Sequence, residues 1–303
     1  MMRRAPHDDG HDEMMYSALL DAVRGLRWRA RRASRVAVPG IHPSRVRGTS
    51  AEFTEYRPYR PGDDLRRIDW KLFARSDRAH VRISEERAVT PTYLVLDASA
   101  SMAFPDGAAS KWSIVRQLAV ALTSVAHSGG DPAGLIVSGN PRATTIPRTR
   151  RGIVGEVAQT LTRASADGSA PLAPSIKAAA RSATRIAILS DFLGDLDETL
   201  QVARELAAAG RDVHALHVIA SEEADPPAAI LAVRDPEVAH VERLLDGDTR
   251  GRYQRAFNEW RASVASQWLA SGAAYHAIVI GKEPLSHTVR RIVRDESAAS
   301  HSA

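Results

Sequence analysis

Three side chains that carry oxygen ligands follow an apolar run at alternate positions. Asp97, Ser99 and Ser101 come directly after the run Tyr93–Leu96. A short apolar run that ends in polar residues is typical of a buried parallel strand, and α/β folds bind ligands outside the carboxyl ends of such strands. One carboxylate and two hydroxyls suit a hard cation such as Mg²⁺. The spacing predicts a divalent metal site; the alternative is a turn at Asp97, with Ser99 and Ser101 as helix caps.

A second apolar run ends in the same way further along the chain. Residues 186–189 are Ile-Ala-Ile-Leu, and Ser190 and Asp191 follow them. If the two runs form neighbouring strands, Asp191 faces Asp97 across a metal ion or a bound water. The second run thus supplies a further carboxylate for the predicted site.

The two strand ends together resemble the metal-ion-dependent adhesion site of von Willebrand factor A domains. The resemblance implies a divalent ion, Mg²⁺ or Mn²⁺, held directly or through water. Such sites usually add a Thr from a further loop, and the corresponding position here falls on Ser169 or Ala170, of which only Ser169 has a hydroxyl. The ligand set that the resemblance implies is Asp97, Ser99, Ser101, Ser169 and Asp191.

Further strand and helix patterns alternate along the chain around these two motifs. Strands are expected at 93–96, 133–138, 143–146, 186–190, 213–219 and 275–280. Helices are expected at 16–35, from Lys111 to the Gly129-Gly130 pair, and at 152–163, 174–183, 196–209 and 249–270. The repeated strand–helix order predicts an α/β fold, a von Willebrand A-like (Rossmann-like) mostly parallel sheet flanked by helices.

Composition sets the class of protein. The 303 residues allow one large or two modest domains, and 44% hydrophobic with 25% charged residues is typical of globular proteins. The absence of Cys excludes disulfides and thiolate sites. No apolar stretch approaches the length of a membrane span, and the N-terminus lacks the pattern of a secretory signal, so we expect a cytoplasmic protein. The net charge of +5 permits anionic partners.

Residues 51–71 mix aromatic side chains with charges of both signs around the turn signal Pro61-Gly62. Such a mixture predicts a folded loop or small subdomain held by pairs of Arg with carboxylates, because the guanidinium group can bind a carboxylate bidentately. The candidate ion-pair residues are Arg57, Asp63, Asp64, Arg67 and Asp69.

Within this segment, residues 59–70 read Tyr-Arg-Pro-Gly-Asp-Asp-Leu-Arg-Arg-Ile-Asp-Trp. Together with Glu85-Glu86-Arg87 and the two strand-end motifs, they closely resemble the domain of unknown function 58 family, whose members join this signature to a von Willebrand A-like domain. The resemblance covers residues 45–285. It implies a partner, a MoxR-type AAA+ ATPase or its client protein.

We therefore expect a non-enzymatic protein-binding and assembly module. The expected division is a disordered tail (1–14), an N-terminal helix with a charged family-specific extension (15–90), a von Willebrand A-like domain (91–285) and a C-terminal helix end and tail (286–303).

Two alternatives belong to other function classes. A metal-dependent phosphodiesterase or nuclease would use Asp63, Asp64 and Asp69, although each has an Arg close in sequence. Nucleic acid could bind through Arg24–Arg47, which holds eight Arg and no acid, but pairing of this run with the chain's own acids is the favoured interpretation. No metalloprotease spacing links the histidines, which are expected to be ordinary polar residues; they are His80, His127, His214, His217 and His276.

Overall fold

The chain divides into two units of unequal size. The computed structural model describes residues 9–31, 53–63, 65–84, 89–227, 232–234, 242–244 and 247–295. One unit joins residues 1–40 to residues 90–303, and the other comprises residues 41–89. The first unit contains both strand-end motifs, and the second contains the charged segment around Pro61-Gly62.

Six of the described strands form the sheet of the first unit, in the order β10-β7-β6-β3-β4-β5. They are β3 (Thr92–Leu96), β4 (Ala133–Val137), β5 (Asn140–Arg148), β6 (Arg185–Ser190), β7 (Asp212–Ile219) and β10 (Ala274–Val279). Every neighbouring pair is parallel except β4 and β5, which are antiparallel. The strand order reverses direction between β3 and β6, and α/β sheets bind ligands at such a switch point.

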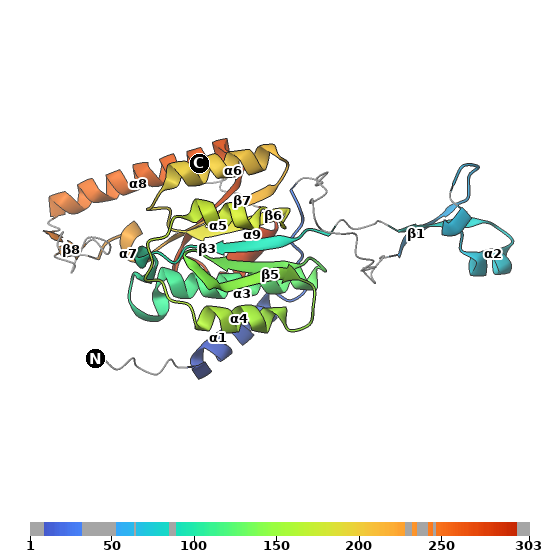
Figure 1. The fold of residues 1–303 in the computed structure, drawn as a ribbon, viewed down its shortest axis with the longest axis horizontal. Helices are drawn as coiled ribbons and strands as arrows, with labels where there is room; N and C mark the ends of the chain where they lie inside the picture. The colour runs from blue at the N-terminus through green and yellow to red at the C-terminus, as the bar shows by residue number, and fades with distance from the viewer. Residues whose placement is uncertain are drawn as a thin grey trace. The chain divides into compact units, whose positions relative to one another are not determined.

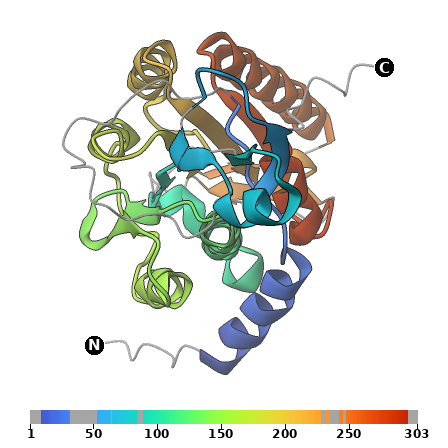
Figure 2. The same ribbon diagram turned by 90° about the vertical axis from the view of Figure 1, so that its right-hand side faces the viewer.

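Helices cover both faces of this sheet (Figures 1 and 2). On one face lie α1 (Asp9–Ala22), α3 (Lys111–Ser128), α4 (Ile153–Thr162) and α9 (Leu285–Val293). On the other lie α5 (Leu172–Ala179), α6 (Leu196–Ala208) and α8 (Gly247–Ala270). Shorter elements are the 3₁₀ turns η2 (Ala100–Ala103) and η3 (Gly107–Ala109), the single turn α7 (Ser221–Ala224), and the hairpin of β8 (Ala232–Arg234) and β9 (Glu242–Leu244).

The first sheet strand shows why the sequence adopts this arrangement. All five residues of β3 are buried; Leu94 and Leu96 pack with α3, whereas Tyr93 and Val95 pack with α5 and α6. A strand covered on both faces is apolar throughout, as the run predicted. The expected α/β class, with a von Willebrand A-like mostly parallel sheet flanked by helices, is therefore confirmed.

The N-terminal region differs from the expectation. Helix α1 begins at Asp9, inside the segment expected to be disordered, and ends at Ala22 instead of near residue 35. Gly25 follows with φ 80, a left-handed conformation that commonly ends helices. Because Tyr16, Leu19 and Val23 pack in the same cluster as α3, this helix belongs with the α/β unit and not with the charged extension. Residues 1–8 lie outside the described part of the chain.

The second unit is a small folded subdomain, as the mixed composition of residues 51–71 predicted. Strand β1 (Phe53–Pro58) pairs antiparallel with β2 (His80–Ser84), and the 3₁₀ turn η1 (Leu65–Arg67) and helix α2 (Trp70–Ser76) lie between them in the chain. Within the described residues of both units, no helix combines the length and apolar character needed to cross a membrane.

Candidate metal and binding site at the carboxyl ends of β3 and β6

The two strand ends meet at the switch point of the sheet. Strands β3 and β6 pair in parallel with Leu96 opposite Leu189, and the Asp97 backbone N–H donates to the Leu189 carbonyl at 2.9 Å. The next residue of β6 touches Asp97 directly, because Ser190 Oγ donates to Asp97 Oδ2 at 2.6 Å. The tertiary pairing thus brings together two polar motifs that lie more than 90 residues apart in the chain.

Asp97 organises the loop that follows β3. Its Oδ1 accepts a hydrogen bond from the Ser99 N–H at 2.8 Å, and Ser99 Oγ lies 3.1 Å from Ser101 Oγ. Ser99 precedes η2, yet its side chain makes no capping hydrogen bond there, so the cap interpretation does not hold for Ser99. Burial raises the pKa of Asp97, and the hydrogen bonds from Ser190 and Ser99 act in the opposite direction. One buried carboxylate and two hydroxyls therefore share a single loop.

The loop expected to supply a further hydroxyl lies against this one. Gly168 N–H donates to the Ala98 carbonyl and the Ala100 N–H donates to the Gly168 carbonyl, both at 2.9 Å. A Cβ on Gly168 would approach the Ala98 oxygen to 3.2 Å, so this contact favours glycine. The contact places the exposed Ser169 at the rim of the site, whereas Ala170 provides its carbonyl to Ser138 Oγ at 3.0 Å.

Asp191 carries an ion pair that the sequence interpretation missed. Its Oδ2 lies 2.8 Å from Lys111 Nζ, which also pairs with Glu223, and the Lys111 side chain is fully buried. Asp191 Oδ1 accepts a hydrogen bond from the Leu193 N–H at 3.2 Å. Burial raises the pKa of Glu223, while the Lys111 ammonium lowers it. An internal cation therefore already neutralises the carboxylate of the second strand end.

One sequence signal could have indicated this role of Lys111. The residue is the first of α3, directly after the cap Ser110, whose Oγ accepts a hydrogen bond from the Ser113 N–H. A cation at the amino end of a helix opposes the helix dipole and needs nearby acids to compensate. Those acids come from the end of β6 and from α7, which are remote in sequence.

The turn after Asp191 is backbone-strained. Phe192 has φ 54, a left-handed conformation that bulky residues rarely adopt. Its N–H donates to Ser190 Oγ at 2.8 Å, and its buried ring lies 4.8 Å from Trp268 and 5.4 Å from His217, measured between ring centroids. This packing holds the strained turn and so determines where Asp191 and Leu193 lie.

The oxygen atoms of the first strand end fit a hard cation. The 3.1 Å between the Ser99 and Ser101 hydroxyls is close to the ~3 Å separation of neighbouring ligands around an octahedral ion with bonds of about 2.1 Å. Each oxygen of Asp97 accepts one hydrogen bond and keeps further acceptor capacity. Asp191 fits less directly, because its Oδ2 already contacts the Lys111 ammonium.

A groove of about 310 Å³ opens beside these oxygens. Ser99, Ser169 and Ser190 line its polar part, and Leu172, Phe192 and Leu196 line its apolar part. Leu193, next to Phe192 in the chain, is 51% exposed. A concave surface that combines a few convergent polar groups with apolar walls is typical of a binding site.

The charged segment of the second unit uses its acids to hold its own fold. Asp63 Oδ1 lies 2.7 Å from Arg57 Nη2, and Asp63 Oδ2 accepts the Arg60 N–H at 2.8 Å. The pKa of Asp63 is lowered, first by the Arg60 N–H and then by Arg57. Asp69 Oδ1 caps α2 by accepting the Lys71 and Leu72 N–H groups at 3.0 Å, and its Oδ2 accepts the Tyr56 hydroxyl at 2.7 Å.

These contacts change the interpretation of the segment in one respect. Arg57 and Asp63, two of the candidate ion-pair residues, do pair, and Asp69 serves as the N-cap of α2. Asp64 and the side chain of Arg67 lie outside the described part of the structure. Two of the three acids that the nuclease alternative requires are thus bound to their own subdomain.

The described part of the Arg24–Arg47 run also contacts the chain's own acids. Arg24 pairs with Asp21 at 2.7 Å and Arg31 pairs with Asp295 at 2.7 Å. The residues beyond Arg31 in this run lie outside the described part. Two of the four arginines in the described part of the run, Arg24 and Arg31, thus pair with the chain's own acids.

The chain is similar over most of its length to proteins of two mycobacteria. It is 28% identical over 281 residues to "Uncharacterized protein Rv1480" of Mycobacterium tuberculosis (strain ATCC 25618 / H37Rv), which covers 90% of this chain and 88% of that protein. The same identity and coverage hold for "Uncharacterized protein Mb1516" of Mycobacterium bovis.

Solved structures with similar folds include conserved hypothetical protein BatB from Bacteroides thetaiotaomicron, at 19% identity and a TM-score of 0.45, covering 68% of this chain and 97% of that one. The SpRpn10 VWA domain is 11% identical, with a TM-score of 0.38, and the match covers 67% of this chain and 94% of that one. The family described as "Protein of unknown function DUF58" matches residues 55–263, more than half of the chain and both strand ends. The chain therefore belongs to the DUF58 family.

Proposed function

We propose that this protein is a non-enzymatic binding and assembly module that engages a protein partner at the carboxyl ends of β3 and β6. The observation that carries the proposal is the convergence of the Asp97, Ser99 and Ser101 oxygens beside a groove with an apolar wall. Membership of the DUF58 family agrees with an interaction role but does not specify one.

Within this proposal, Asp97, Ser99 and Ser101 hold Mg²⁺ or Mn²⁺, and Ser169 and Asp191 contribute from the rim, through water. A bound ion would supply a coordination position that an Asp or Glu carboxylate of the partner can occupy. Ser190 and the Ser99 N–H orient the Asp97 carboxylate. The Lys111 ammonium holds Asp191 beside the site, and Leu193 offers an exposed apolar contact.

The proposed partner is a MoxR-type AAA+ ATPase or its client protein. This part of the proposal is supported by the resemblance of residues 59–70 and of the strand ends to the family signature, and by no contact in the structure. The groove and the rim would position the client or the ATPase without catalysing a reaction.

The experiment is a pull-down of a purified MoxR-type ATPase from the same genome, in Mg²⁺ and in EDTA. We expect recovery in Mg²⁺ and reduced recovery in EDTA or with Asp97→Asn, which keeps the shape of the carboxyl group and removes its charge. The matched control is Glu259→Gln, which makes the same chemical change at an exposed position of α8. Recovery that is indifferent to EDTA and to Asp97→Asn would remove the metal-dependent mechanism.

The nuclease and nucleic-acid alternatives predict different outcomes in the same preparation. A nuclease would cleave DNA or RNA in Mg²⁺ and lose that activity with Asp63→Asn. Nucleic-acid binding through the arginine run would show a steep dependence on salt concentration, because phosphate contacts release counterions. No contact of the described residues favours either alternative over the binding module.

A further inference from the structure

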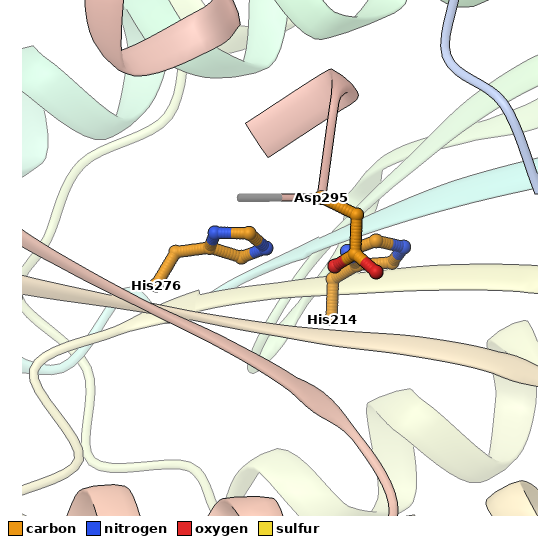
Figure 3. A group of neighbouring side chains, drawn as sticks. All are labelled: His214, His276 and Asp295. Carbon is orange, nitrogen blue, oxygen red and sulfur yellow. The ribbon is translucent and has the colours of Figure 1, made fainter. Parts of the chain in front are cut away.

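A cluster of two histidines and one aspartate lies near the amino ends of β7 and β10, the edge of the sheet opposite to the Asp97 site. His214 of β7 and His276 of β10 are fully buried, and Ala274 pairs with His214 across the two parallel strands. Their rings are parallel within 11°, with centroids 5.8 Å apart. Asp295, just after α9, directs its carboxylate towards the two rings (Figure 3). One ligand atom from each of the three residues lies within 4.8 Å of the others.

Most polar atoms of this cluster have no hydrogen-bond partner among the described residues. They are both ring nitrogens of His276, Nδ1 of His214 and Oδ1 of Asp295. Buried polar atoms nearly always have a hydrogen-bond partner. A group of buried nitrogen and oxygen atoms that face each other without one therefore indicates that a metal ion or a hydrogen-bonding molecule lies between them. The sequence spacing gave no sign of this, since the three residues come from separate elements.

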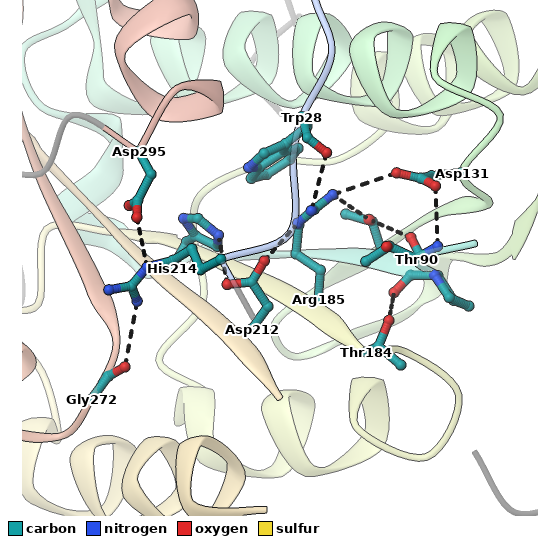
Figure 4. Close-up of polar contacts among 12 residues, drawn as sticks. Trp28, Thr90, Asp131, Thr184, Arg185, Asp212, His214, Gly272 and Asp295 are labelled. Carbon is teal, nitrogen blue, oxygen red and sulfur yellow. Dashed lines mark hydrogen bonds and ion pairs between the residues drawn. The ribbon is translucent and has the colours of Figure 1, made fainter. Parts of the chain in front are cut away.

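A second layer of charged residues orients His214 (Figure 4). His214 Nε2 lies 3.2 Å from Asp212 Oδ1, and Asp212 Oδ2 accepts a hydrogen bond from Arg185 Nε at 3.1 Å. The Arg185 guanidinium is fully buried and lies over the Trp28 ring, 4.6 Å from its centroid. A carboxylate beside one nitrogen of a histidine favours the proton on that nitrogen, which leaves the other nitrogen free to bind a metal.

We propose that His214, His276 and Asp295 form a site for a transition-metal dication of the Zn²⁺ type. Two imidazoles and a carboxylate suit Zn²⁺ or Co²⁺ better than Mg²⁺, which prefers oxygen ligands. The three ligand atoms lie within 4.8 Å of one another, so a point equidistant from them is at most about 2.8 Å from each. Bonds to Zn²⁺ are ~2.0–2.2 Å long. Small side-chain rotations therefore close the site, and water can supply the fourth ligand.

The ion would connect the chain after α9 to the sheet. Asp295 also pairs with Arg31 at 2.7 Å, and both line a pocket of about 530 Å³ between residues 25–31 and 293–295, through which the ion can enter. Arg27, Arg29 and Arg294 line the same pocket, and their charges slow the approach of a cation. Binding should therefore be measured after incubation long enough for the signal to become constant.

The test is direct titration of the full chain with Co²⁺, followed by visible absorption, and with Zn²⁺, followed by metal analysis after gel filtration. In Asp97→Asn, which lacks the divalent site of the proposed function, we expect one ion per chain with the absorption of a nitrogen- and oxygen-ligated Co²⁺ centre. His276→Gln should abolish this ion, and Asp212→Asn, which alters only the orienting layer, should weaken Co²⁺ binding by about 10–100-fold. Matched controls are His287→Gln, at an exposed position of α9, and Asp97→Asn, at the opposite edge of the sheet.

Several results would overturn the proposal. The absence of bound metal in the parent protein would show that the cluster is not a metal site. Metal that is lost with Asp97→Asn but retained with His276→Gln would place the ion at the other edge. If His276→Gln does not fold, Asp295→Asn takes its place, and unchanged Co²⁺ affinity in Asp295→Asn and Asp212→Asn would be equally decisive. The His276, Asp295 and Asp212 variants leave the Asp97 site unchanged, so their results test this proposal separately from the proposed binding function.

Discussion

Replacing Lys111 by Met should destabilise the protein strongly. Lys111 is fully buried, and the side chains of its two partners, Asp191 and Glu223, are only 3% and 17% exposed. Met fills the space of the aliphatic stem, so the main loss is the ammonium group. Breaking a buried pair by removing one partner leaves an uncompensated charge, and the free energy of unfolding falls by about 3–5 kcal/mol. At ~2–4 °C for each kcal/mol, the melting temperature should fall by roughly 6–20 °C.

The matched control is Lys177→Met. Lys177 pairs with Glu198 at 3.5 Å, but the two side chains are 57% and 44% exposed. Exposed pairs contribute only ~0–1 kcal/mol, so this variant should melt close to the parent protein. Thermal melting followed by far-UV circular dichroism compares the two. A Lys111→Met variant that melts within a few degrees of Lys177→Met would refute the reasoning, because the charges of Asp191 and Glu223 would then be compensated elsewhere.

The pH dependence gives an independent check of the same pair. Burial raises the pKa of Glu223, and loss of the Lys111 ammonium removes an influence that lowers it. In the folded Lys111→Met protein, Glu223 therefore keeps its proton at a pH at which the same carboxyl group of the unfolded chain has lost it. The stability of the variant thus falls as pH rises above the ordinary pKa of a carboxyl group. The difference in melting temperature between parent and variant should widen from pH 5 to pH 8.

Three further predictions concern other parts of the chain. Millimolar Mg²⁺ should raise the melting temperature of the parent protein but not of Asp97→Asn. A ligand that binds only the native state, at a concentration of 100 times its Kd, stabilises that state by about 2.7 kcal/mol. Equal shifts in both proteins would count against the metal site. Asp69→Ala should lower the stability of the second unit by about 2 kcal/mol, because about 1 kcal/mol is lost with the cap of α2 and about 1 kcal/mol with the Tyr56 hydrogen bond. Asp69→Asn should keep the cap. Hydrogen exchange of the α2 amides measures the stability of both variants. Burial lowers the pKa of His217 to about 3, so the unfolded chain binds a proton that the folded one does not, and stability should fall as pH drops from 6.5 towards 3; a His217→Gln protein with an equally steep profile in urea denaturation would contradict this origin.

Local sequence patterns determined most of the fold. The runs that became β3 and β6 are apolar on both faces because helices cover both sides of the sheet, and this requirement is visible in the run itself. Ser110 caps α3, and Gly210, with φ 79, follows α6; Ser and Gly are residue types typical of these two positions. That the two strand-end motifs are neighbours was only a condition in the sequence analysis, and the pairing of β3 with β6 meets it.

Interactions between remote residues could not be derived in this way. The partners of Lys111 lie 80 and 112 residues away, and Tyr16, Leu19 and Val23 pack in the same cluster as α3, which is remote in sequence. The cluster of His214, His276 and Asp295 likewise arises where two strands and the end of α9 converge. Periodicity and capping depend on neighbours within a few residues, so the sequence by itself determined the elements and their ends. Which buried charges and imidazoles face one another depends on how those elements pack, and only the tertiary structure decided that.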